Sequence, residues 1–287
     1  MSKHWIKNKA ELATTPERGM VLDIMEAGLD AIDTKKIIES SVTLSDKKLT
    51  IKNSDFDLTN IDNIYVIGFG KASCLAASVL DEILGEVITE GVAIGLAPIS
   101  CEYIQTYGGT HPHPSVQNVE VSEKIMELSK RISDKDLVIV VVSGGGSALL
   151  CWPMEECKQA NRLYEDFLKT GGDIRELNTI RKHLSMLKGG GLAKQLYPAT
   201  AIGLIFSDVP GDNFEYIASG PTYKDVTTIL DAQAILDKYG LTDYTLNETP
   251  NDDKYFERVT NIPMVSNLEA LEAMKTKAAS FGIKTEI

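Results

Sequence analysis

The chain has 287 residues, a formal net charge of −12, and 43% hydrophobic and 24% charged residues. This length allows one large α/β domain or two small ones, and the acidic charge argues against nucleic acid or an anionic membrane surface as a partner. The four cysteines lack metal-ligand spacing, and no apolar run approaches the length of a membrane span. The sequence therefore predicts a cytoplasmic protein with reduced thiols.

The first elements carry no residues typical of a site. Residues 16–41 place apolar side chains on one face with a 3.6-residue period, and Pro16 stands where helices accept proline. This pattern predicts one long helix or two short ones packed on a sheet. Residues 48–51 are expected to form a short edge strand.

The first site-like feature follows an apolar strand at residues 63–67. The strand runs into a short motif containing Gly68, Gly70, Lys71 and Ser73, and an apolar-faced helix continues from there. A strand, a glycine turn and a helix in this order present backbone N–H groups to an anion. We therefore predict that these four residues contribute to ligand binding.

Two familiar phosphate-binding patterns do not fit this motif. A Walker A loop requires Ser or Thr directly after its lysine, whereas Ala72 follows Lys71. A dinucleotide fingerprint requires an acidic residue at the end of the next strand, and the end of residues 87–96 is apolar, which disfavours NAD. What remains is a lysine in the first turn of a helix, at the strand end where open α/β sheets bind ligands, so Lys71 is predicted to be functional.

Two histidines follow in the segment 108–115. His111 and His113 are each followed by proline, and no third metal ligand lies nearby in the sequence. The prolines predict a rigid loop with a structural or substrate-shaping role, with His111 as the site residue of the pair. Residues 119–132 then predict an amphipathic helix.

The central strand is the longest apolar run among the predicted strands. Residues 137–142 are six consecutive apolar residues, which predicts a strand buried on both faces of a parallel sheet. It ends in a glycine-rich turn between two serines, made of Ser143, Gly144, Gly145, Gly146 and Ser147. Three glycines exceed what a tight turn needs, so this turn is predicted to bind an anion.

A basic segment follows a predicted helix at residues 154–170. Residues 176–193 carry cations and an amide at helical spacings of three or four and then a second glycine run; the candidates are Asn178, Arg181, Lys182, Lys188, Gly189 and Gly190. Cations that share one helix face repel one another unless an anion lies opposite. The segment is predicted to be an anion site, with a solvated basic face as the alternative.

A second buried strand, residues 199–206, leads to two aspartates. Asp208 follows the strand end, where a carboxylate can hold Mg²⁺ or accept a proton. Asp208 and Asp212 could equally form the turn around Pro210 and Gly211. Further on, the pattern predicts helices at residues 229–239 and 268–281, a strand at 262–265, and the start of another strand at 283–287.

These motifs occur in the same order in the glycerate 2-kinase family. The chain resembles that family, also called MOFRL-type glycerate kinase and in older naming hydroxypyruvate reductase, from about residue 16 onward. The resemblance implies a Rossmann-like three-layer α/β/α sandwich with a mostly parallel sheet. It implies an enzyme that phosphorylates D-glycerate at its 2-hydroxyl with ATP and Mg²⁺, with Lys71 as a catalytic residue. The residues that bind the metal ion are left unassigned.

Members of that family usually continue into a MOFRL domain that closes the cleft, and the resemblance implies that residues 1–287 correspond to the N-terminal domain alone. The expectation is therefore weak turnover by this chain unless it pairs with a separate MOFRL chain. An uncovered cleft wall would also favour self-association, such as a homodimer. Two alternatives stay open: an NAD(P)H-dependent hydroxypyruvate reductase, and a non-catalytic half that binds ligand.

Overall fold

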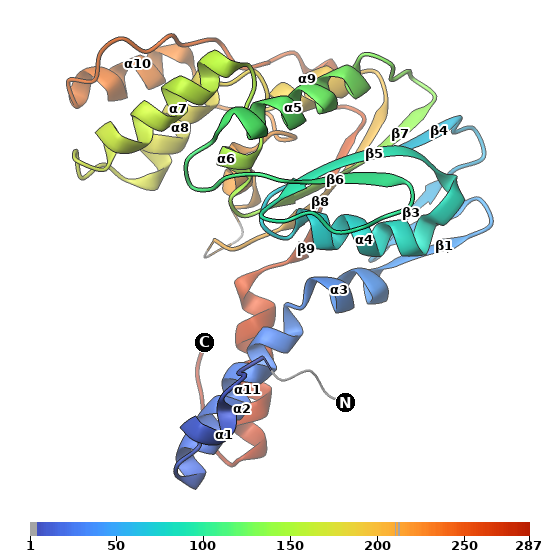
Figure 1. The fold of residues 1–287 in the computed structure, drawn as a ribbon, viewed down its shortest axis with the longest axis vertical. Helices are drawn as coiled ribbons and strands as arrows, with labels where there is room; N and C mark the ends of the chain where they lie inside the picture. Colours follow the sequence, from blue (N-terminus) through green and yellow to red (C-terminus); the bar gives the residue numbers. More distant parts are fainter. Residues whose placement is uncertain (1–4, 210, 212) are drawn as a thin grey trace.

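Six parallel strands form the central sheet in the order β6-β5-β4-β7-β8-β9 (Figure 1). The computed structural model describes residues 5–209, 211 and 213–287. The strands are β4 (Asn63–Phe69), β5 (Ile88–Gly95), β6 (Ile104–Gly108), β7 (Asp136–Ser143), β8 (Thr200–Phe206) and β9 (Val259–Val265). The predicted buried strands are all present, and β6 is an edge strand that the sequence pattern did not reveal.

The continuous apolar runs have a direct cause in this sheet, because both faces are covered. In β7 the side chains of Val138, Val140 and Val142 enter one core, whereas Ile139 and Val141 enter the other. Strands with two buried faces cannot alternate between polar and apolar residues. The predicted three-layer α/β/α sandwich is therefore confirmed.

Helices form the outer layers of the sandwich. The helix α4 (Ser73–Leu84) covers one face together with α3 (Thr34–Ser41), and α5 (Val116–Ser129) and α9 (Gly191–Leu196) cover the other. A third apolar cluster joins α7 (Met154–Phe167), α8 (Ile174–Leu184) and α10 (Ile229–Lys238). The remaining short elements are α6 (Gly146–Leu149), η1 (Gly85–Val87), η2 (Phe214–Ser219) and η3 (Asp253–Tyr255).

A small antiparallel sheet lies beside the α3–α4 face. It consists of β1 (Val42–Ser45), β2 (Lys48–Ile51) and β3 (Ser54–Asp57), in that order. The predicted strand at residues 48–51 is thus β2, but it belongs to this small sheet and not to the edge of the main one. Its Leu49 and Ile51 side chains are fully buried in the α3–α4 core.

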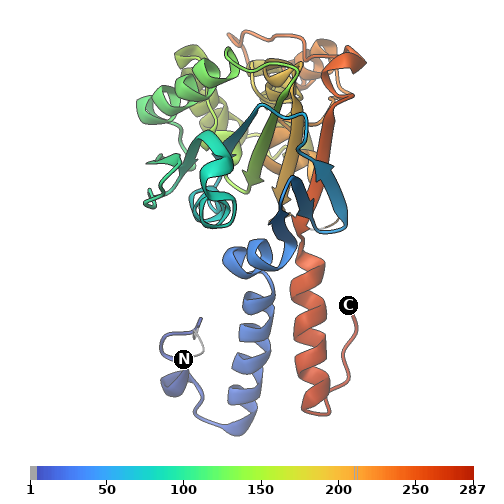
Figure 2. The same ribbon diagram turned by 90° about the vertical axis from the view of Figure 1, so that its right-hand side faces the viewer.

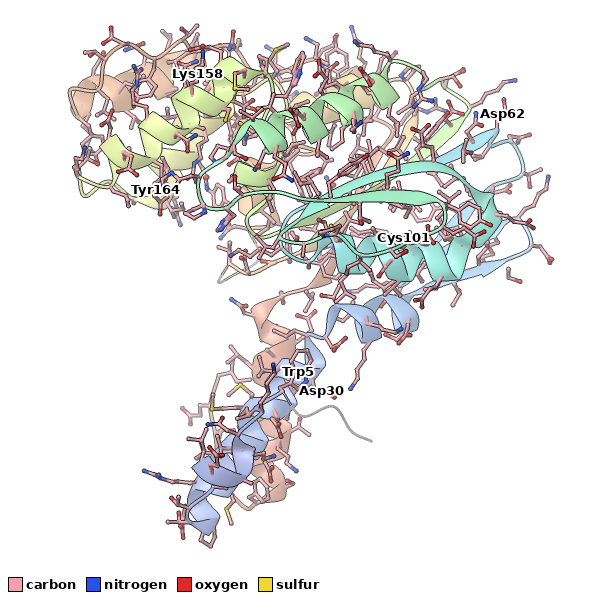
Figure 3. All side chains as sticks on the ribbon, in the orientation of Figure 1. Trp5, Asp30, Asp62, Cys101, Lys158 and Tyr164 are labelled. Atoms are coloured by element: carbon pink, nitrogen blue, oxygen red, sulfur yellow. The ribbon has the colours of Figure 1, made fainter. Side chains whose placement is uncertain are left out.

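A pair of long helices projects away from the sandwich (Figures 1 and 2). It is formed by α2 (Pro16–Ala31) and α11 (Asn267–Ser280), with α1 (Lys9–Leu12) alongside, and Trp5 donates a hydrogen bond of 3.4 Å to Asp30 within it (Figure 3). The expectation that residues 16–41 pack on the sheet is wrong for α2, because its partner is α11.

The end of the chain also differs from the sequence pattern. Residues 283–287 are irregular, so the predicted strand there is wrong. The preceding α11 begins at a capping box in which Ser266 and Glu269 satisfy each other's backbone N–H groups. Val21, Met25 and Leu271 of the helix pair remain largely exposed.

Candidate active site

The candidate site lies where the strand order of the sheet reverses. From β4 the chain builds outward through β5 and β6, and from β7 it builds in the opposite direction through β8 and β9. Open α/β sheets bind ligands at the carboxyl ends of the strands on either side of such a reversal. The turn after β4 contains Gly70 and Lys71, and the turn after β7 is the first glycine loop (residues 143–147). Two motifs separated by about seventy residues of sequence therefore meet at this point.

Backbone contacts hold the two turns together. The N–H of Lys71 donates to the carbonyl of Gly144 at 2.9 Å, and the N–H of Ala72 donates to Ser143 Oγ at 3.1 Å. Gly70 has a φ of +121°, and a Cβ atom there would lie 2.1 Å from Ser143 Oγ. Only glycine allows this approach, so Gly70 and Ser143 act together to position Lys71.

Two further residues that were predicted to bind ligand, Ser73 and Gly68, make contacts inside the protein instead. The hydroxyl of Ser73 is fully buried and donates to the carbonyls of Gly70 and Ile94 at 2.7 and 2.5 Å. A Cβ atom at Gly68 would lie 3.0 Å from Ala93 Cβ on the neighbouring strand. Ser73 and Gly68 therefore shape the turn from inside, and their polar groups do not face a ligand.

Three side chains converge on the first glycine loop. A Cβ atom at Gly144 would lie 1.8 Å from Asp208 Oδ2, so the carboxylate lies against that Cα. A Cβ atom at Gly145 would lie 3.0 Å from His111 Cδ2 and 3.1 Å from Lys71 Cε. Each of the three comes from the end of a different strand, and all three are exposed. A lysine, a histidine and a carboxylate thus surround Gly144, which is buried, and Gly145, which is half-buried.

The backbone amides of this loop have no internal acceptor. Within the part of the chain that the structure describes, the N–H groups of Gly144, Gly145, Gly146 and Ser147 donate to no protein atom. Gly145 adopts a φ of +83°, which turns the chain into the first residue of α6. Consecutive free amides in a turn of this kind form a concave anion site.

The far side of the loop is fixed by a hydrogen-bonded row of side chains. Ser147 Oγ lies 2.9 Å from Ser219 Oγ, and Ser219 donates to Asn178 Oδ1 at 3.2 Å. Ser219 and Asn178 are both buried. Asn178 therefore reaches the loop through Ser219, a residue that the sequence reasoning did not single out.

Asn118 is a second positioning residue that the sequence reasoning missed. It is fully buried, accepts the N–H of Thr110 at 2.9 Å, and donates to the carbonyls of Thr110 and Ala148 at 2.9 Å each. These bonds tie the histidine segment to the end of the first glycine loop and thereby place His111. The only sequence signal is an amide on the apolar face of an amphipathic helix, where a buried polar group requires partners.

The helix α8 brings one further cation to the site. It begins at a capping box in which Asp173 accepts the N–H groups of Arg175 and Glu176 at 2.8 and 2.9 Å. Leu177 and Ile180 pack into the cluster with α7 and α10. This orientation leaves Arg181 half-buried beside the site, and among the described residues it forms no ion pair and no hydrogen bond.

Burial and neighbouring charges change the pKa values of two site residues, His111 and Arg181. Partial burial and the positive charge of Lys71 lower the pKa of His111 below its usual value of 6.5; Arg181 acts in the same direction and Asp208 in the opposite one. Burial also lowers the pKa of the Arg181 guanidinium. His111 is therefore mostly neutral at pH 7, whereas Lys71 and Arg181 supply positive charge that no described carboxylate pairs with.

The other two predicted cations are paired inside the protein. Lys182 Nζ lies 2.9 Å from Asp225 Oδ1, and both side chains are almost fully buried. Lys188 forms a buried ion pair with Glu156 and donates to the carbonyl of Leu150 at 2.9 Å. Two lysines of the basic segment are thus used in buried ion pairs, and Arg181 is its cation that remains available to a ligand.

The second glycine run is closed to ligands by its own packing. The N–H groups of Gly189 and Gly190 donate to the carbonyls of Ser219 and Gly220 at 2.9 and 2.8 Å. Both glycines have positive φ, and a Cβ atom at Gly190 would lie 2.6 Å from the ring of Phe256. These glycines therefore support the Ser219 segment, and the first glycine loop is the one with free amides.

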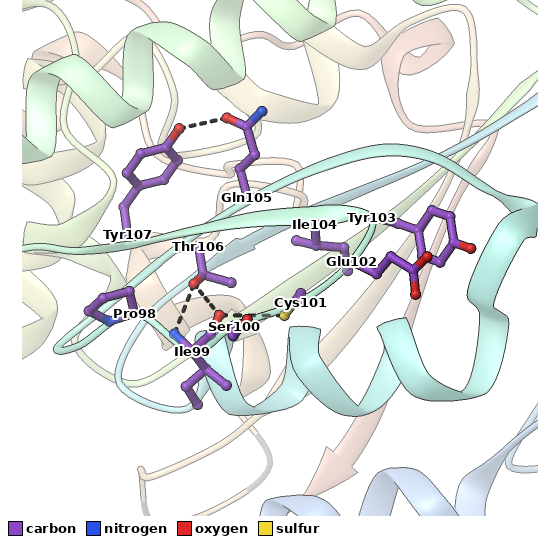
Figure 4. A pocket seen from close by; sticks show the side chains of 10 residues that line it. All are labelled: Pro98, Ile99, Ser100, Cys101, Glu102, Tyr103, Ile104, Gln105, Thr106 and Tyr107. Carbon is purple, nitrogen blue, oxygen red and sulfur yellow. Dashed lines mark hydrogen bonds between the residues drawn. The ribbon is translucent and has the colours of Figure 1, made fainter.

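Some predicted features lie elsewhere or outside the described residues. Asp212 is outside them, and among residues 5–209, 211 and 213–287 no three His, Cys, Asp or Glu side chains form a metal-binding group. His113 turns toward α7, with its ring 4.8 Å from that of Tyr164. A cavity of about 570 Å³ lies along residues 98–107 (Figure 4), and none of the predicted site residues lines it.

Comparison with known proteins identifies the family. A family model described as Domain of unknown function (DUF4147) matches residues 20–249. The chain belongs to this family. The resemblance to glycerate 2-kinases is likewise confirmed, because two curated relatives of this DUF4147 chain are named Glycerate 2-kinase and D-glycerate 2-kinase.

Two of these relatives and two solved structures show the extent of the match. The chain is 34% identical to Glycerate 2-kinase of Pyrococcus horikoshii, over 93% of this chain and 65% of that protein. It is 33% identical to D-glycerate 2-kinase of Thermotoga maritima, over 79% and 57%. The crystal structure of glycerate kinase from Thermotoga maritima has a TM-score of 0.76 at 26% identity, covering 93% of this chain and 63% of that one. The PH0495 protein of Pyrococcus horikoshii has a TM-score of 0.75 at 32% identity, covering 94% and 65%.

The chain therefore spans less than two thirds of the length of these relatives. A further relative, 36% identical over 72% of this chain and 48% of that protein, is named Putative hydroxypyruvate reductase of Agrobacterium vitis. Among the described residues of this DUF4147 chain, every helix is too short or too polar to cross a bilayer.

Proposed function

We propose that this chain forms the part of a glycerate 2-kinase that binds D-glycerate and ATP and transfers the γ-phosphoryl group to the 2-hydroxyl. The observation that carries the proposal is the convergence of Lys71 and Asp208 on a loop with four consecutive backbone amides that donate to no described protein atom. Arg181 adds positive charge that acts on His111 beside that loop. Both substrates are anions. Two unpaired cations and an amide cradle match the charge that they bring into an otherwise acidic protein.

Phosphoryl transfer requires positioning and charge neutralisation more than covalent chemistry. In the proposed reaction the amides of the first glycine loop hold phosphate oxygens, and Lys71 stabilises the charge on the transferred group. Asp208 orients the attacking hydroxyl and accepts its proton as the oxygen–phosphorus bond forms and ADP leaves. Neutral His111 can hydrogen-bond a hydroxyl of the substrate, and Arg181 can pair with the glycerate carboxylate.

Mg²⁺ fits the residues present. Magnesium is usually held by one or two carboxylates together with substrate phosphates, and Asp208 offers one exposed carboxylate against the first glycine loop. Asp208 would hold the ion through one carboxylate oxygen, which leaves the other oxygen to accept the proton of the hydroxyl. When bound, Mg²⁺ would neutralise charge on the phosphate oxygens.

We further propose that residues 5–287 act as the N-terminal domain of a two-domain kinase. The relatives named glycerate 2-kinase are longer than this chain, and α2 and α11 expose Val21, Met25 and Leu271 on a projecting helix pair. A MOFRL-type domain, fused or on a separate chain, would cover this surface and close the site; a homodimer is the other arrangement that would cover it. The four cysteines are free, which suits the reducing cytoplasm.

The name of the Agrobacterium vitis relative raises a second candidate, an NAD(P)H-dependent reduction of hydroxypyruvate. A dinucleotide site needs an acidic residue at the end of the strand after the glycine turn. Here that strand is β5, which ends in Ala93, Ile94 and Gly95. The kinase is therefore the better supported function.

One experiment separates the two reactions. The protein is incubated with D-glycerate, ATP and Mg²⁺, and in parallel with hydroxypyruvate and NADH. We expect ADP release together with 2-phosphoglycerate, which phosphorus NMR distinguishes from the 3-phosphate. NADH oxidation without ADP release would contradict the kinase proposal. Addition of a MOFRL-type domain should raise the rate if the second domain closes the site.

A further inference from the structure

A separate cavity of about 340 Å³ lies between α8 and the segment that follows β8. Its lining includes Arg175, Thr179 and Lys182 from one face of α8, and Glu215, Tyr216 and Tyr223 from the opposite wall. None of the residues that surround the first glycine loop lines it. The volume lies at the lower end of the range for small-molecule sites.

The charges around this cavity are nearly balanced. Lys182 pairs with Asp225 at 2.9 Å, and Lys224, which also lines the cavity, pairs with Asp253. The two remaining charges, on Arg175 and Glu215, are opposite in sign. A pocket with almost no net charge is poorly suited to a phosphate and better suited to an uncharged polar ring.

Two tyrosines supply aromatic surface and polar groups in the cavity. Among the described residues, the hydroxyls of Tyr216 and Tyr223 have no hydrogen-bond partner. Burial and the nearby Glu215 raise the pKa of Tyr223 to about 12, so its hydroxyl stays protonated and can donate. Aromatic faces beside free polar groups are what binding sites for nucleobases offer.

The same segment connects the cavity with the first glycine loop. Tyr216 and Ser219 both belong to η2, and Ser219 bonds Ser147 of the loop at 2.9 Å. A Cβ atom at Gly146 would lie 2.6 Å from Ala218 Cβ in the same segment. Three residues of extended chain span at most about 11 Å, so the wall of the cavity begins within that distance of Ser219. An extended nucleoside triphosphate is long enough to reach from one to the other.

We propose that this cavity binds the base of the nucleotide whose phosphates lie on the first glycine loop. The inference rests on the proposed kinase function and adds the position of the base, with η2 as the bridge between the two parts of the ligand. The purine ring stacks on a tyrosine and accepts or donates hydrogen bonds with the free hydroxyls.

The test uses Thr179→Trp, which fills the cavity from α8. The matched control is Ile174→Trp on the same helix, because Ile174 is 60% exposed and lies outside the cavity. The affinities of the full chain for ATP and for inorganic tripolyphosphate, which lacks a base, are measured by calorimetry. We expect Thr179→Trp to weaken ATP binding about tenfold or more and to leave tripolyphosphate binding unchanged, while Ile174→Trp changes neither.

Each outcome has a definite meaning. If the wild-type protein binds ATP and Thr179→Trp does not weaken this binding, the base site is overturned and the kinase proposal stands. Equal weakening of ATP and tripolyphosphate also overturns it, because the cavity then holds phosphate. Tyr216→Leu provides a second variant that removes the ring without blocking the cavity, and it must weaken ATP binding selectively as well. If the wild-type protein binds no nucleotide, the proposed function itself fails.

Discussion

The contact between Gly144 and Asp208 offers a sharp test of the candidate site. No positive φ is required at Gly144, so alanine is compatible with the backbone, and only the new Cβ atom matters. That atom would lie 1.8 Å from Asp208 Oδ2, and contacts under 3.0 Å are essentially never observed. The carboxylate of Asp208 must therefore retreat by about 1.2 Å in Gly144→Ala.

A displacement of this size should reduce activity far more than stability. Asp208 is an exposed side chain, so its movement costs the fold little. A reacting group misplaced by about 1 Å can lose on the order of a hundredfold in rate. We therefore expect kcat to fall about a hundredfold in Gly144→Ala, with a change in Tm of no more than a few degrees.

The assay measures initial rates of ADP release with D-glycerate and Mg²⁺-ATP, together with thermal unfolding. Gly19→Ala is the control, because the nearest atom to its new Cβ, Ala13 Cβ, lies at an ordinary 3.9 Å. If Gly144→Ala keeps a rate within twofold of Gly19→Ala, the position of Asp208 does not matter for the reaction. The assignment of Asp208 to the site would then be refuted.

Three further predictions follow from individual contacts. Lys71→Ala should lower kcat about a hundredfold or more with a much smaller effect on ATP affinity, because the lysine acts on charge that develops in the transition state; unchanged turnover would exclude that role. Lys188→Met should lower the free energy of unfolding, measured in urea, by about 3–5 kcal/mol because it leaves the Glu156 carboxylate buried without its cation. Adding Glu156→Gln should recover part of this loss; if the double variant is no more stable than Lys188→Met, the pairing is contradicted. Because the pKa of His111 is lower in the folded state, the unfolded chain binds more protons than the folded one below about pH 6.5. The free energy of unfolding should therefore fall as the pH drops through that range, and it should fall less in His111→Asn. Identical pH profiles of the two proteins would remove His111 as the cause.

Local pattern was sufficient for the main layers of the fold and for the centre of the site. The six apolar residues at 137–142 belong to a strand buried on both faces, and the glycines after it form the turn with free amides. The position of Lys71 at a strand end also follows from the sequence, since strand, turn and helix are adjacent there. Each of these inferences depends on neighbouring residues alone.

The partners of the basic segment could not be read from the chain. Lys182 pairs with Asp225 and Lys188 with Glu156, residues that are 43 and 32 positions away. No local pattern distinguishes a paired lysine from an available one, because the compensating charge arrives from another element. For the same reason Asn118 and Ser219, which hold the loops through distant hydrogen bonds, were missed.

For the same reason, the sequence could not tell which of the two glycine runs keeps free amides, nor which element packs against α2. Both glycine runs have flexible backbones, but only the tertiary structure shows that the amides of Gly189 and Gly190 are consumed by the Ser219 segment. The apolar face of α2 predicts burial and cannot say whether a sheet or α11 provides it. The sequence by itself determined most of the segments that become strands, helices and turns, because those preferences are local; β6 and residues 283–287 are the exceptions. Which polar groups remain free for a ligand was decided by the tertiary structure alone, since a donor or a charge is used up by whatever the fold places beside it.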